Sequence, residues 1–581
     1  MKRAGMRSRH NRGMNRFPRL LPFAIATTLT ACASAPHAPA TASTGIHVDV
    51  PTIERPAGES AAWWFRDGAA QAAERGAMQG RAKNVIIFIG DGMSLTTVAA
   101  ARIFEGQRKG GSGEDNRLAW ETFPATALSK TYNTNSQTPD SAGTMSAIAT
   151  GVKTRLGVVS IAQDPVRKDC AGALAAPVLT LWELASSSGM ATGVVTTTRV
   201  TDATPAATFS HSAERNWEND TDLTEKARTD GCIDIARQMV ESPFGNGPDV
   251  LMGGGRDNFM TTRQHDPEYG DTVGMRQDGR DIIAEWQARH AGGVYAWNAR
   301  QLADAPLDKP LLALFQPGHM RYEHDRSQDG AGEPSLSEMT RAAITRLSRN
   351  PHGYVLLVEG GNIDKASHAG NAYRALTDTV ALSDAVRVAG ELTSADDTLI
   401  LVTADHSHTL TMSGYGRRGN PIMGKVHGGS SESIATTNPT ALARDATGRP
   451  YTTLNYASGP GYSGASAQQP EGPKHFPHLP KDFVPAKQAR PDLTDIDTEN
   501  PDYLQEAIFP LGSETHGGDD VGIWARGPGS LAVRGSLEEN AIFHVLLQAT
   551  PRLRAALCAK GLCDANGVPV ELPKIADFKP R

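Results

Sequence analysis

The sequence has no apolar run long enough to span a bilayer, so we expect no transmembrane helix. It also lacks an excess of basic residues: among 581 residues, 58 are Lys or Arg and 64 are Asp or Glu, a formal net charge of −6. Nucleic-acid binding relies on many Lys and Arg contacts to phosphates, so a nucleic acid is not an expected partner. The apolar content of 39% predicts a globular, soluble protein with one large α/β domain carrying insertions, or two domains.

The first 31 residues lack acidic side chains but contain seven Lys or Arg. A short apolar segment at residues 20–30 follows and overlaps Leu29-Thr-Ala-Cys32. This order is typical of a secretory signal peptide. Residues 29–32 resemble a bacterial lipobox. This resemblance implies a lipoprotein signal at residues 1–31, cleavage before Cys32 and lipidation of its sulfur. The alternative is an ordinary signal cleaved near Ala35 or Ala40, and Met14 is a second candidate start.

Removal of residues 1–31 takes away seven positive charges, so the formal net charge falls from −6 to −13. Residues 32–58 are rich in Ala, Pro, Thr and Ser, and we expect a flexible tether there. No Asp follows Cys32 directly, which in lipoproteins implies the outer membrane. We therefore expect an exported outer-membrane lipoprotein that meets the membrane only through its lipid, with a soluble periplasmic protein as the alternative.

Cysteine is scarce, with five residues in the whole sequence, and four remain after Cys32. An even number of cysteines in an exported chain indicates disulfides. Pairing of nearest neighbours would join Cys170 to Cys232 and Cys558 to Cys563. Free, buried thiols are the alternative.

Five short runs rich in β-branched residues predict buried strands of a mainly parallel sheet. Helical patterns lie between the runs, for instance at residues 339–349 and 372–391, and residues 59–81 also predict a helix. This alternation indicates an α/β fold. The predicted strands are residues 85–89, 192–197, 250–252, 354–358 and 398–402.

The pattern of strands and helices breaks at residues 409–512, which are rich in Gly, Pro, Ser and Tyr. We interpret this segment as a loop-rich insertion, followed by a return strand near residues 521–525.

Residues that can bind metal ions follow several predicted strands directly, at the edge where open α/β sheets form their sites. Asp364 and His368 stand four apart, so they share a face if a helix begins near Ile363, and could hold one zinc with His516. A second metal could be held by Asp405, His406 and Asp91. Asp91, Thr204 and Glu359 supply oxygen atoms that suit Mg²⁺. Each residue alone would more often be a helix cap or an ordinary hydrogen-bonded group.

Asp140 and Ser141 precede a predicted helix at residues 145–150. Free N–H groups at a helix N-terminus stabilise an anion, so Ser141 is a candidate nucleophile. Asp and Ser are also the preferred N-caps, which is the plainer interpretation. Arg215 can clamp two phosphate oxygens, although alone it could equally be a surface arginine.

Six motifs in order together resemble the alkaline phosphatase family, from about Trp63 to Cys563. The resemblance implies a three-layer α/β sandwich with a mainly parallel sheet, formed by residues 59–408 and 513–575, with a crown insertion at residues 409–512. The motifs are Asp91-Gly-Met, Pro139-Asp-Ser141-Ala-Gly-Thr, Thr196-Thr-Thr-Arg-Val200, Val358-Glu-Gly, Thr403-Ala-Asp-His-Ser-His408 and Glu514-Thr-His516.

The resemblance implies hydrolysis of small phosphate monoesters with two Zn²⁺ and one Mg²⁺. Ser141 would become a phosphoserine, Arg215 would bind phosphate oxygens, and Asp140 would position Arg215. It implies a homodimer with a dimer arm at the Trp63–Trp64 helix, and the same two disulfides. The implied metal ligands are Asp364, His368 and His516 for one zinc, Asp91, Asp405 and His406 for the other, and Asp91, Thr204 and Glu359 for magnesium. Ser141 is a further implied metal-binding residue, and His408 has a supporting position.

Two departures from vertebrate members of that family concern charge near the site. Asp202 and Lys365 stand where those members have histidines, and we expect Lys365 to strengthen phosphate binding while Asp202 supports the magnesium site. Near a calcium site of vertebrate members, Glu268, Phe315 and Glu333 match, whereas Gln316 replaces a carboxylate. Loss of that charge disfavours Ca²⁺.

Two other functions remain as alternatives. One is a related metalloenzyme that cleaves diesters or sulfate esters, although Ser141 lies outside the Cys/Ser-x-Pro-x-Arg pattern of sulfatases. The other is a non-catalytic surface lipoprotein that binds phosphate or metal. A binding protein has no use for Ser141, which favours the enzyme.

Overall fold

The computed structural model describes residues 58–428, 440–488 and 490–579. They lie in one compact unit. The predicted signal peptide, Cys32 and the tether up to residue 57 lie outside the described residues. In the described part of the chain, no helix combines the length and apolar character needed to cross a membrane.

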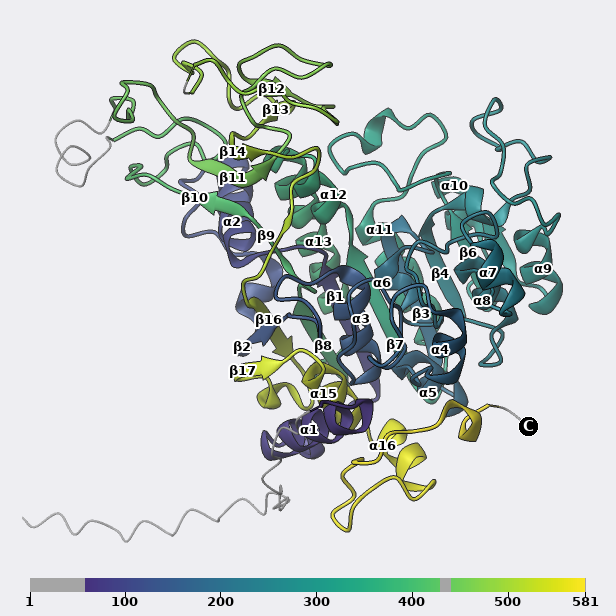
Figure 1. Ribbon diagram of the computed structural model, residues 1–581. Coiled ribbons are helices and arrows are strands. Elements are labelled where there is room, and N and C mark those ends of the chain that lie inside the picture. The colour runs from purple at the N-terminus through teal and green to yellow at the C-terminus, as the bar shows by residue number, and fades with distance from the viewer. Residues whose placement is uncertain (1–57, 429–439, 489, 580–581) are drawn as a thin grey trace, which may run out of the picture. The chain divides into compact units, whose positions relative to one another are not determined.

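A ten-stranded, mainly parallel sheet lies at the centre of the fold (Figure 1), so the predicted fold class is confirmed. β1 (Asn84–Gly90) pairs in parallel with β7 and β8, and β3 extends the parallel part beyond β7. The strand order is β17-β2-β16-β8-β1-β7-β3-β4-β6-β5. The other parallel strands are β3 (Ala191–Arg199), β4 (Val250–Gly254), β5 (Val294–Ala296), β6 (Leu311–Leu314), β7 (Tyr354–Gly360) and β8 (Thr398–Thr403).

β16 (Val521–Arg526) is the antiparallel member of this sheet. It lies between β8 and β2 (Ala125–Lys130), and β17 (Gly535–Glu538) then pairs in parallel with β2. The return strand predicted from the apolar run near residues 521–525 is therefore present, and it joins two parts of the sheet that are distant in sequence.

Helices cover both faces of the sheet because the central strands are apolar on both faces. Alternate residues of β1 point to opposite sides: Ile87 packs in one core cluster and Phe88 in the other. The first face is covered by α1 (Ala61–Glu74), α3 (Ser141–Thr150), α5 (Leu181–Ser187) and α15 (Ala541–Ala549). The second face is covered by α2 (Leu95–Arg108), α11 (Leu336–Leu347) and α13 (Ala372–Leu392).

Shorter helices connect these elements or lie at the ends of the sheet. α12, directly after β7, positions two of the candidate metal ligands. The short helices are α4 (Cys170–Ala175), α6 (Ala203–Ala206), α7 (Glu225–Thr229), α8 (Ile235–Glu241), α9 (Ile282–Arg289), α10 (Ala299–Asp304), α12 (Asn362–His368) and α16 (Pro551–Cys558).

The predicted helix at residues 59–81 is shorter than expected. α1 ends at Glu74, and Gly76 adopts the left-handed conformation with φ of 85°. A glycine in this conformation commonly ends a helix because it carries no Cβ. A separate 3₁₀ turn at Ala77–Gln79 follows. Trp64 is buried against the core of the same chain.

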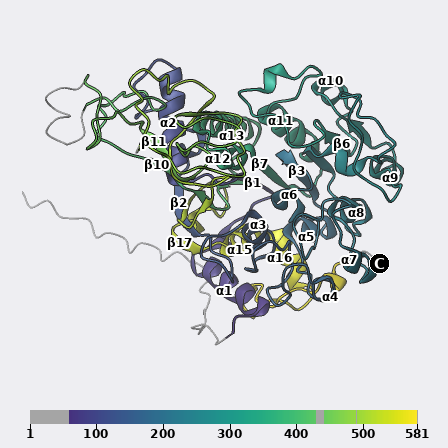
Figure 2. The same cartoon turned by 45° about the horizontal axis from the view of Figure 1, so that its top comes forward.

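The described part of residues 409–512 consists of loops with short strands. β10 (Leu410–Met412), β11 (Leu454–Gly459) and β14 (Ala507–Pro510) form a three-stranded sheet, which lies beside α2 in Figures 1 and 2. Four further strands have two residues each: one directly precedes the segment, two lie within it and one follows it. These are β9 (Ser407–His408), β12 (Lys474–His475), β13 (Tyr503–Leu504) and β15 (His516–Gly517). β15 pairs with β9, which returns the chain to the end of β8.

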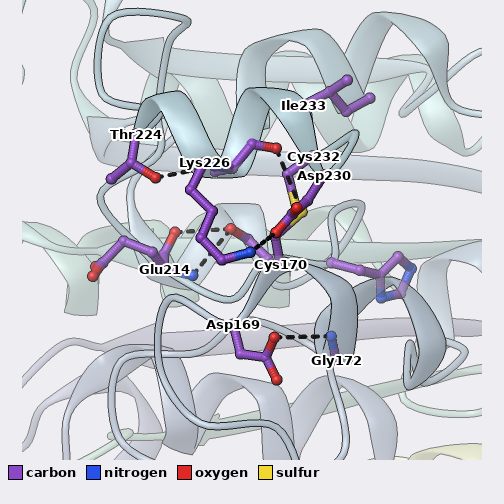
Figure 3. Close-up of a disulfide and its surroundings, with 12 residues drawn as sticks. Asp169, Cys170, Gly172, Glu214, Thr224, Lys226, Asp230, Cys232 and Ile233 are labelled. Carbon is purple, nitrogen blue, oxygen red and sulfur yellow. Dashed lines mark hydrogen bonds and ion pairs between the residues drawn. A yellow bond between two sulfur atoms is a disulfide. The ribbon is translucent and has the colours of Figure 1, made fainter.

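Two disulfides join Cys170 to Cys232 and Cys558 to Cys563, the pairing that nearest neighbours predict. Figure 3 shows the first, which ties the beginning of α4 to the segment after α7. Asp169 caps the N-terminus of α4 beside this disulfide, because its carboxylate accepts a hydrogen bond from the backbone N–H of Gly172 at 3.1 Å. The two disulfides indicate folding in an oxidising, exported compartment.

Candidate active site

The candidate ligands meet at the carboxyl ends of adjacent strands. Asp91 follows β1, Glu359 lies at the end of β7, and Asp405 and His406 follow β8. These strands are neighbours in the sheet, so residues far apart in sequence are brought to one edge. The buried positions of these side chains place them beneath the surface of that edge.

The first group consists of Asp364, His368 and His516. Asp364 Oδ1 lies 3.3 Å from His368 Nε2 and 3.5 Å from His516 Nε2. His368 Nδ1 lies 2.6 Å from the carbonyl of Glu514, and His516 Nδ1 lies 2.8 Å from that of Pro139. Donation from each Nδ1–H to a carbonyl leaves both Nε2 lone pairs for a metal. The two Nε2 atoms lie 3.1 Å apart, an arrangement that a shared cation stabilises.

The second group consists of Asp91, Asp405 and His406, all fully buried or nearly so. His406 Nε2 lies 3.3 Å from Asp91 Oδ1 and 3.4 Å from Asp405 Oδ2. Burial raises the pKa of both carboxyl groups and lowers that of His406 well below its usual range. Burial therefore opposes charge on all three side chains, and a bound cation would reverse this for the carboxylates.

The predicted magnesium ligands provide the most direct test of fit to an ion. Asp91 Oδ1, Thr204 Oγ1 and Glu359 Oε1 are buried and have no hydrogen-bond partner among the described residues. The other oxygen of Glu359 is held by Thr196 and Thr198. Buried polar atoms without partners are costly and rare. Their oxygen character fits Mg²⁺, so these residues suit a hard cation.

His408 contacts the first group and links it to Glu514. Its Nε2 lies 2.7 Å from Asp364 Oδ1, and its Nδ1 contacts the Glu514 carboxylate. Burial disfavours a charge on His408, but Glu514 and Asp364 raise its pKa to about 10. Sequence reasoning placed His408 beside the site but missed Glu514. The position of Glu514 two residues before His516 was a signal that could have found it.

Ser141 is the first residue of α3, and Asp140 is the N-cap. The Asp140 carboxylate accepts hydrogen bonds from the backbone N–H groups of Gly143 at 3.1 Å and Gly157 at 3.0 Å. The capping role therefore belongs to Asp140, and Ser141 Oγ lies 3.1 Å from His406 Nε2. The hydroxyl thus faces the metal-ligand cluster from the positive end of a helix.

Two cations border the same site. Arg215 contacts Asp140 at 3.2 Å and Asp202 at 3.1 Å, while Lys365 Nζ lies 3.5 Å from Asp202 and 3.0 Å from Asp364. Burial opposes ionisation of Asp202, but Lys365, Arg199 and Arg215 hold its pKa well below the usual range. Asp202 is therefore an anionic support that fixes both cations.

Sequence reasoning missed the support behind Asp202. Arg199 donates from Nε and Nη2 to Glu218 at 2.8 and 2.7 Å, and its Nη2 lies 3.5 Å from Asp202. Arg199 Nη1 also donates to His319 Nε2 at 2.6 Å. The signal was present, because Arg199 belongs to the Thr-Thr-Thr-Arg motif at the end of β3, but the partner Glu218 is set by the fold.

The residues near the expected calcium position form a different acidic cluster, which includes Asp329. The Gln316 amide donates to Asp329 Oδ1 at 2.9 Å, and Arg321 Nε lies 3.5 Å from the same oxygen. Glu333 accepts from the backbone N–H of Arg321, and Glu268 lies 3.5 Å from Arg256 Nη2. Phe315 is buried beside Gln316. Amide and guanidinium groups thus occupy the neighbourhood of these carboxylates.

Comparisons with known proteins agree with this geometry. The family model described as alkaline phosphatase matches residues 82–551. The chain is 40% identical over 508 residues to the tissue-nonspecific alkaline phosphatase of Gallus gallus, covering 85% of this chain and 90% of that protein. It is 39% identical over 476 residues to the Homo sapiens isozyme, covering 81% and 83%.

Solved structures show the same fold. The crystal structure of Thermus thermophilus alkaline phosphatase superposes with a TM-score of 0.56 at 25% identity, covering 81% of this chain and 92% of that one. The alkaline phosphatase of the Antarctic bacterium TAB5 gives 0.51 at 21% identity, covering 81% and 98%.

The fold and the clustered carboxylates and imidazoles define a metal-dependent hydrolase of phosphate monoesters. The chain belongs to the alkaline phosphatase family.

Proposed function

We propose that this alkaline phosphatase works through a covalent phosphoserine on Ser141, with two zinc ions and one magnesium ion bound. The observation that carries the proposal is the position of Ser141 Oγ, buried at a helix N-terminus and 3.1 Å from His406 Nε2 within the ligand cluster. A serine with only a structural role would not need to face this group of carboxylates and imidazoles.

The ions would be held by three sets of residues that share Asp91. When bound, they supply concentrated positive charge that activates the nucleophile and stabilises the oxygen that departs. One zinc would be held by Asp364, His368 and His516, the other by Asp91, Asp405 and His406, and magnesium by Asp91, Thr204 and Glu359.

Ser141 then attacks the phosphorus atom of the bound monoester. The Ser Oγ–P bond forms as the hydroxyl loses its proton to solvent, the bond from phosphorus to the alcohol oxygen breaks, and the departing alkoxide takes up a proton from water to give the alcohol. Water cleaves the phosphoserine in the second step, which restores the hydroxyl and releases inorganic phosphate. The transition state is loose, so positioning and charge stabilisation carry the catalysis.

Arg215 binds two non-bridging oxygens of the phosphoryl group. Its guanidinium is already oriented by Asp140 and Asp202, which reduces the conformational freedom lost on binding. A monoester is a dianion with three non-bridging oxygens, whereas a diester is a monoanion with two, so the cationic clamp binds the monoester more strongly. This favours monoesters over the diester alternative.

The charge content of the site also supports a role for Lys365 in holding phosphate. Its ammonium is fixed between Asp202 and Asp364, and these carboxylates raise its pKa against the effect of burial. Lys365 therefore stays charged at alkaline pH, and we infer that it strengthens the binding of both substrate and product.

Initial rates with an aryl monoester and the matching bis-ester, for wild type and Ser141→Ala, test the proposal. We expect fast monoester hydrolysis that collapses in the variant, while zinc and magnesium content stays unchanged. Ser187→Ala, at the exposed end of α5, is the control and should keep full activity. Preference for the bis-ester, or activity indifferent to Ser141, would contradict the mechanism.

The setting of the enzyme forms a further part of the proposal. We propose a signal peptide at residues 1–31, a lipid on Cys32, a tether at 32–58, a catalytic domain at 59–408 and 513–575, a crown at 409–512, and a homodimer. Labelled fatty acid should enter the wild type but not Cys32→Ala, and sedimentation should give twice the monomer mass. If the wild type takes up no label, the proposed lipid anchor is wrong. If sedimentation gives the monomer mass, the proposed homodimer is wrong.

A further inference from the structure

A cavity of about 560 Å³ adjoins the proposed phosphate site and shares Lys365 with it. Two of its lining residues contact the charged groups of that site: Lys365 lies 3.5 Å from Asp202, and His319 Nδ1 lies 3.9 Å from the same carboxylate. A molecule whose phosphoryl group lies beside Lys365 can therefore extend into the cavity. The volume is typical of small-molecule sites.

One wall of the cavity is aromatic: Phe476 comes from the loop-rich segment after β8, and Tyr322 comes from the loop after β6. Phe476 follows β12, and its backbone N–H donates to the carbonyl of Asp502 at 2.7 Å. Its ring meets Tyr322 edge to face, with centroids 5.9 Å apart and planes at 80°. Both rings are partly exposed to the cavity rather than buried in a core.

The aromatic wall is held in place by Arg374 of α13. The guanidinium lies 4.1 Å from the centroid of the Phe476 ring. It is also bound to Asp325 at 2.8 Å and to Asp502 at 3.0 Å. Asp325 and Asp502 thus balance the charge of Arg374. The rings therefore do not face an unpaired charge, and a neutral group can pack beside them. A wall fixed by this many contacts is organised before a ligand binds.

We propose that this cavity is a subsite for the alcohol portion of the substrate, and that it favours phosphate monoesters whose alcohol carries a planar aromatic ring. The ring packs against Phe476 and Tyr322 while the phosphoryl group stays between Lys365 and Arg215. Aromatic pairs gain free energy beyond simple burial, so the preference arises from the rings themselves. This inference rests on the proposed function, because it assumes that the phosphoryl group binds beside Lys365.

Competitive inhibition by phosphonates tests the subsite without any covalent step. We expect Phe476→Ala to raise the inhibition constant of phenylphosphonate about three- to tenfold, and that of methylphosphonate less than twofold. Phe476→Leu keeps most of the volume but removes the ring, and should show most of the same loss. Phe509→Ala is the matched control, because Phe509 is an exposed aromatic of the same segment outside this cavity.

Equal changes for both phosphonates, or no change for either, would overturn the subsite. The result is independent of Ser141, because phosphonates are not hydrolysed. Failure of the proposed mechanism would instead appear as wild-type activity that does not depend on Ser141.

Rates of hydrolysis then show which substrates place a ring in the subsite: those with the ring bonded directly to the phosphate, or nucleotides with a more distant base. If Phe476→Ala lowers kcat/KM for 1-naphthyl phosphate but not for adenosine 5′-monophosphate, the subsite takes rings attached directly to the phosphate. If it lowers kcat/KM for the nucleotide, the nucleobase reaches the rings. Glycerol 2-phosphate is the ring-free control. An equal loss for glycerol 2-phosphate would contradict a ring subsite.

Discussion

The catalytic cluster of carboxylates and the cluster near the expected calcium position differ in what surrounds them. In the catalytic cluster, Asp91 Oδ1 and Glu359 Oε1 have no hydrogen-bond partner among the described residues. In the cluster near the expected calcium position, Asp329 is contacted by the Gln316 amide and by Arg321. Both clusters are rich in oxygen, but the buried oxygens without a hydrogen-bond partner belong to the first.

This difference separates a metal site from an ion-pair network. Carboxylates that face each other without donors need a cation, because burial and mutual repulsion oppose their charge. Carboxylates that already face amide and guanidinium groups gain less from one. Acidic composition alone therefore does not identify a metal site, and the satisfaction of each oxygen is the better criterion.

Removal of metal ions should produce the largest contrast. A chelator that strips zinc and magnesium leaves the catalytic carboxylates uncompensated, so we expect activity to fall at least about a thousandfold and Tm to drop. Activity assays and differential scanning calorimetry, with zinc and magnesium restored afterwards, provide the measurement. A calcium-selective chelator should change neither quantity. If it lowers Tm, the second cluster holds an ion after all.

Arg199 supports the catalytic cluster from behind Asp202 and should have the next largest effect. We expect Arg199→Ala to lower kcat/KM about 10- to 100-fold, the usual cost of losing an outer support of a site. Arg199→Lys should recover part of the loss, since it keeps the charge but not both contacts to Glu218. Arg237→Ala, which removes a half-exposed helix ion pair, is the control. Similar losses in both alanine variants would refute a specific role.

Lys365→His tests whether the extra cation governs product binding. The substitution replaces the positive charge beside the phosphate with a neutral imidazole. We therefore expect the inhibition constant of inorganic phosphate to rise roughly fivefold at pH 9. Steady-state kinetics of the wild type and the variant, with inorganic phosphate as the inhibitor, measure this constant. An unchanged constant would show that Lys365 does not hold the product.

The smallest effect should be a pH dependence of stability at the second cluster. Burial raises the pKa of Glu333 to about 7, above its ordinary value of 4.5. The folded state therefore binds the proton more tightly, and this stabilisation is lost as pH rises through that interval. Glu333→Gln should show a flatter Tm profile between pH 4.5 and 7. If calcium flattens the wild-type profile, the cluster binds that ion in its charged form.

The sequence predicted the central sheet well because its strands are buried on both faces. Continuous apolar runs such as residues 354–358 and 398–402 reflect that burial, and the ligand-type residues directly after them marked the edge of the sheet. The end of α1 was missed because one Gly-containing turn outweighed helix-favouring composition.

Long-range partners could not be predicted from the residues alone. The contact between His408 and Glu514 depends on the pairing of β9 with β15, and that between Arg199 and Glu218 depends on the loop after α6. The aromatic wall at Phe476 likewise depends on how a loop-rich segment folds over α13. Such contacts are set by tertiary packing rather than by local periodicity.

The position of β16 has a consequence for the order in which the enzyme matures. This strand enters the sheet between β8 and β2, and His516 precedes it by a few residues. A ribosome delivers these residues after nearly all the others, so the sheet cannot close and the ligand set cannot form on a partly synthesised chain. An exported chain therefore acquires its ions where it finishes folding, and the metal supply of that compartment determines which ions it carries.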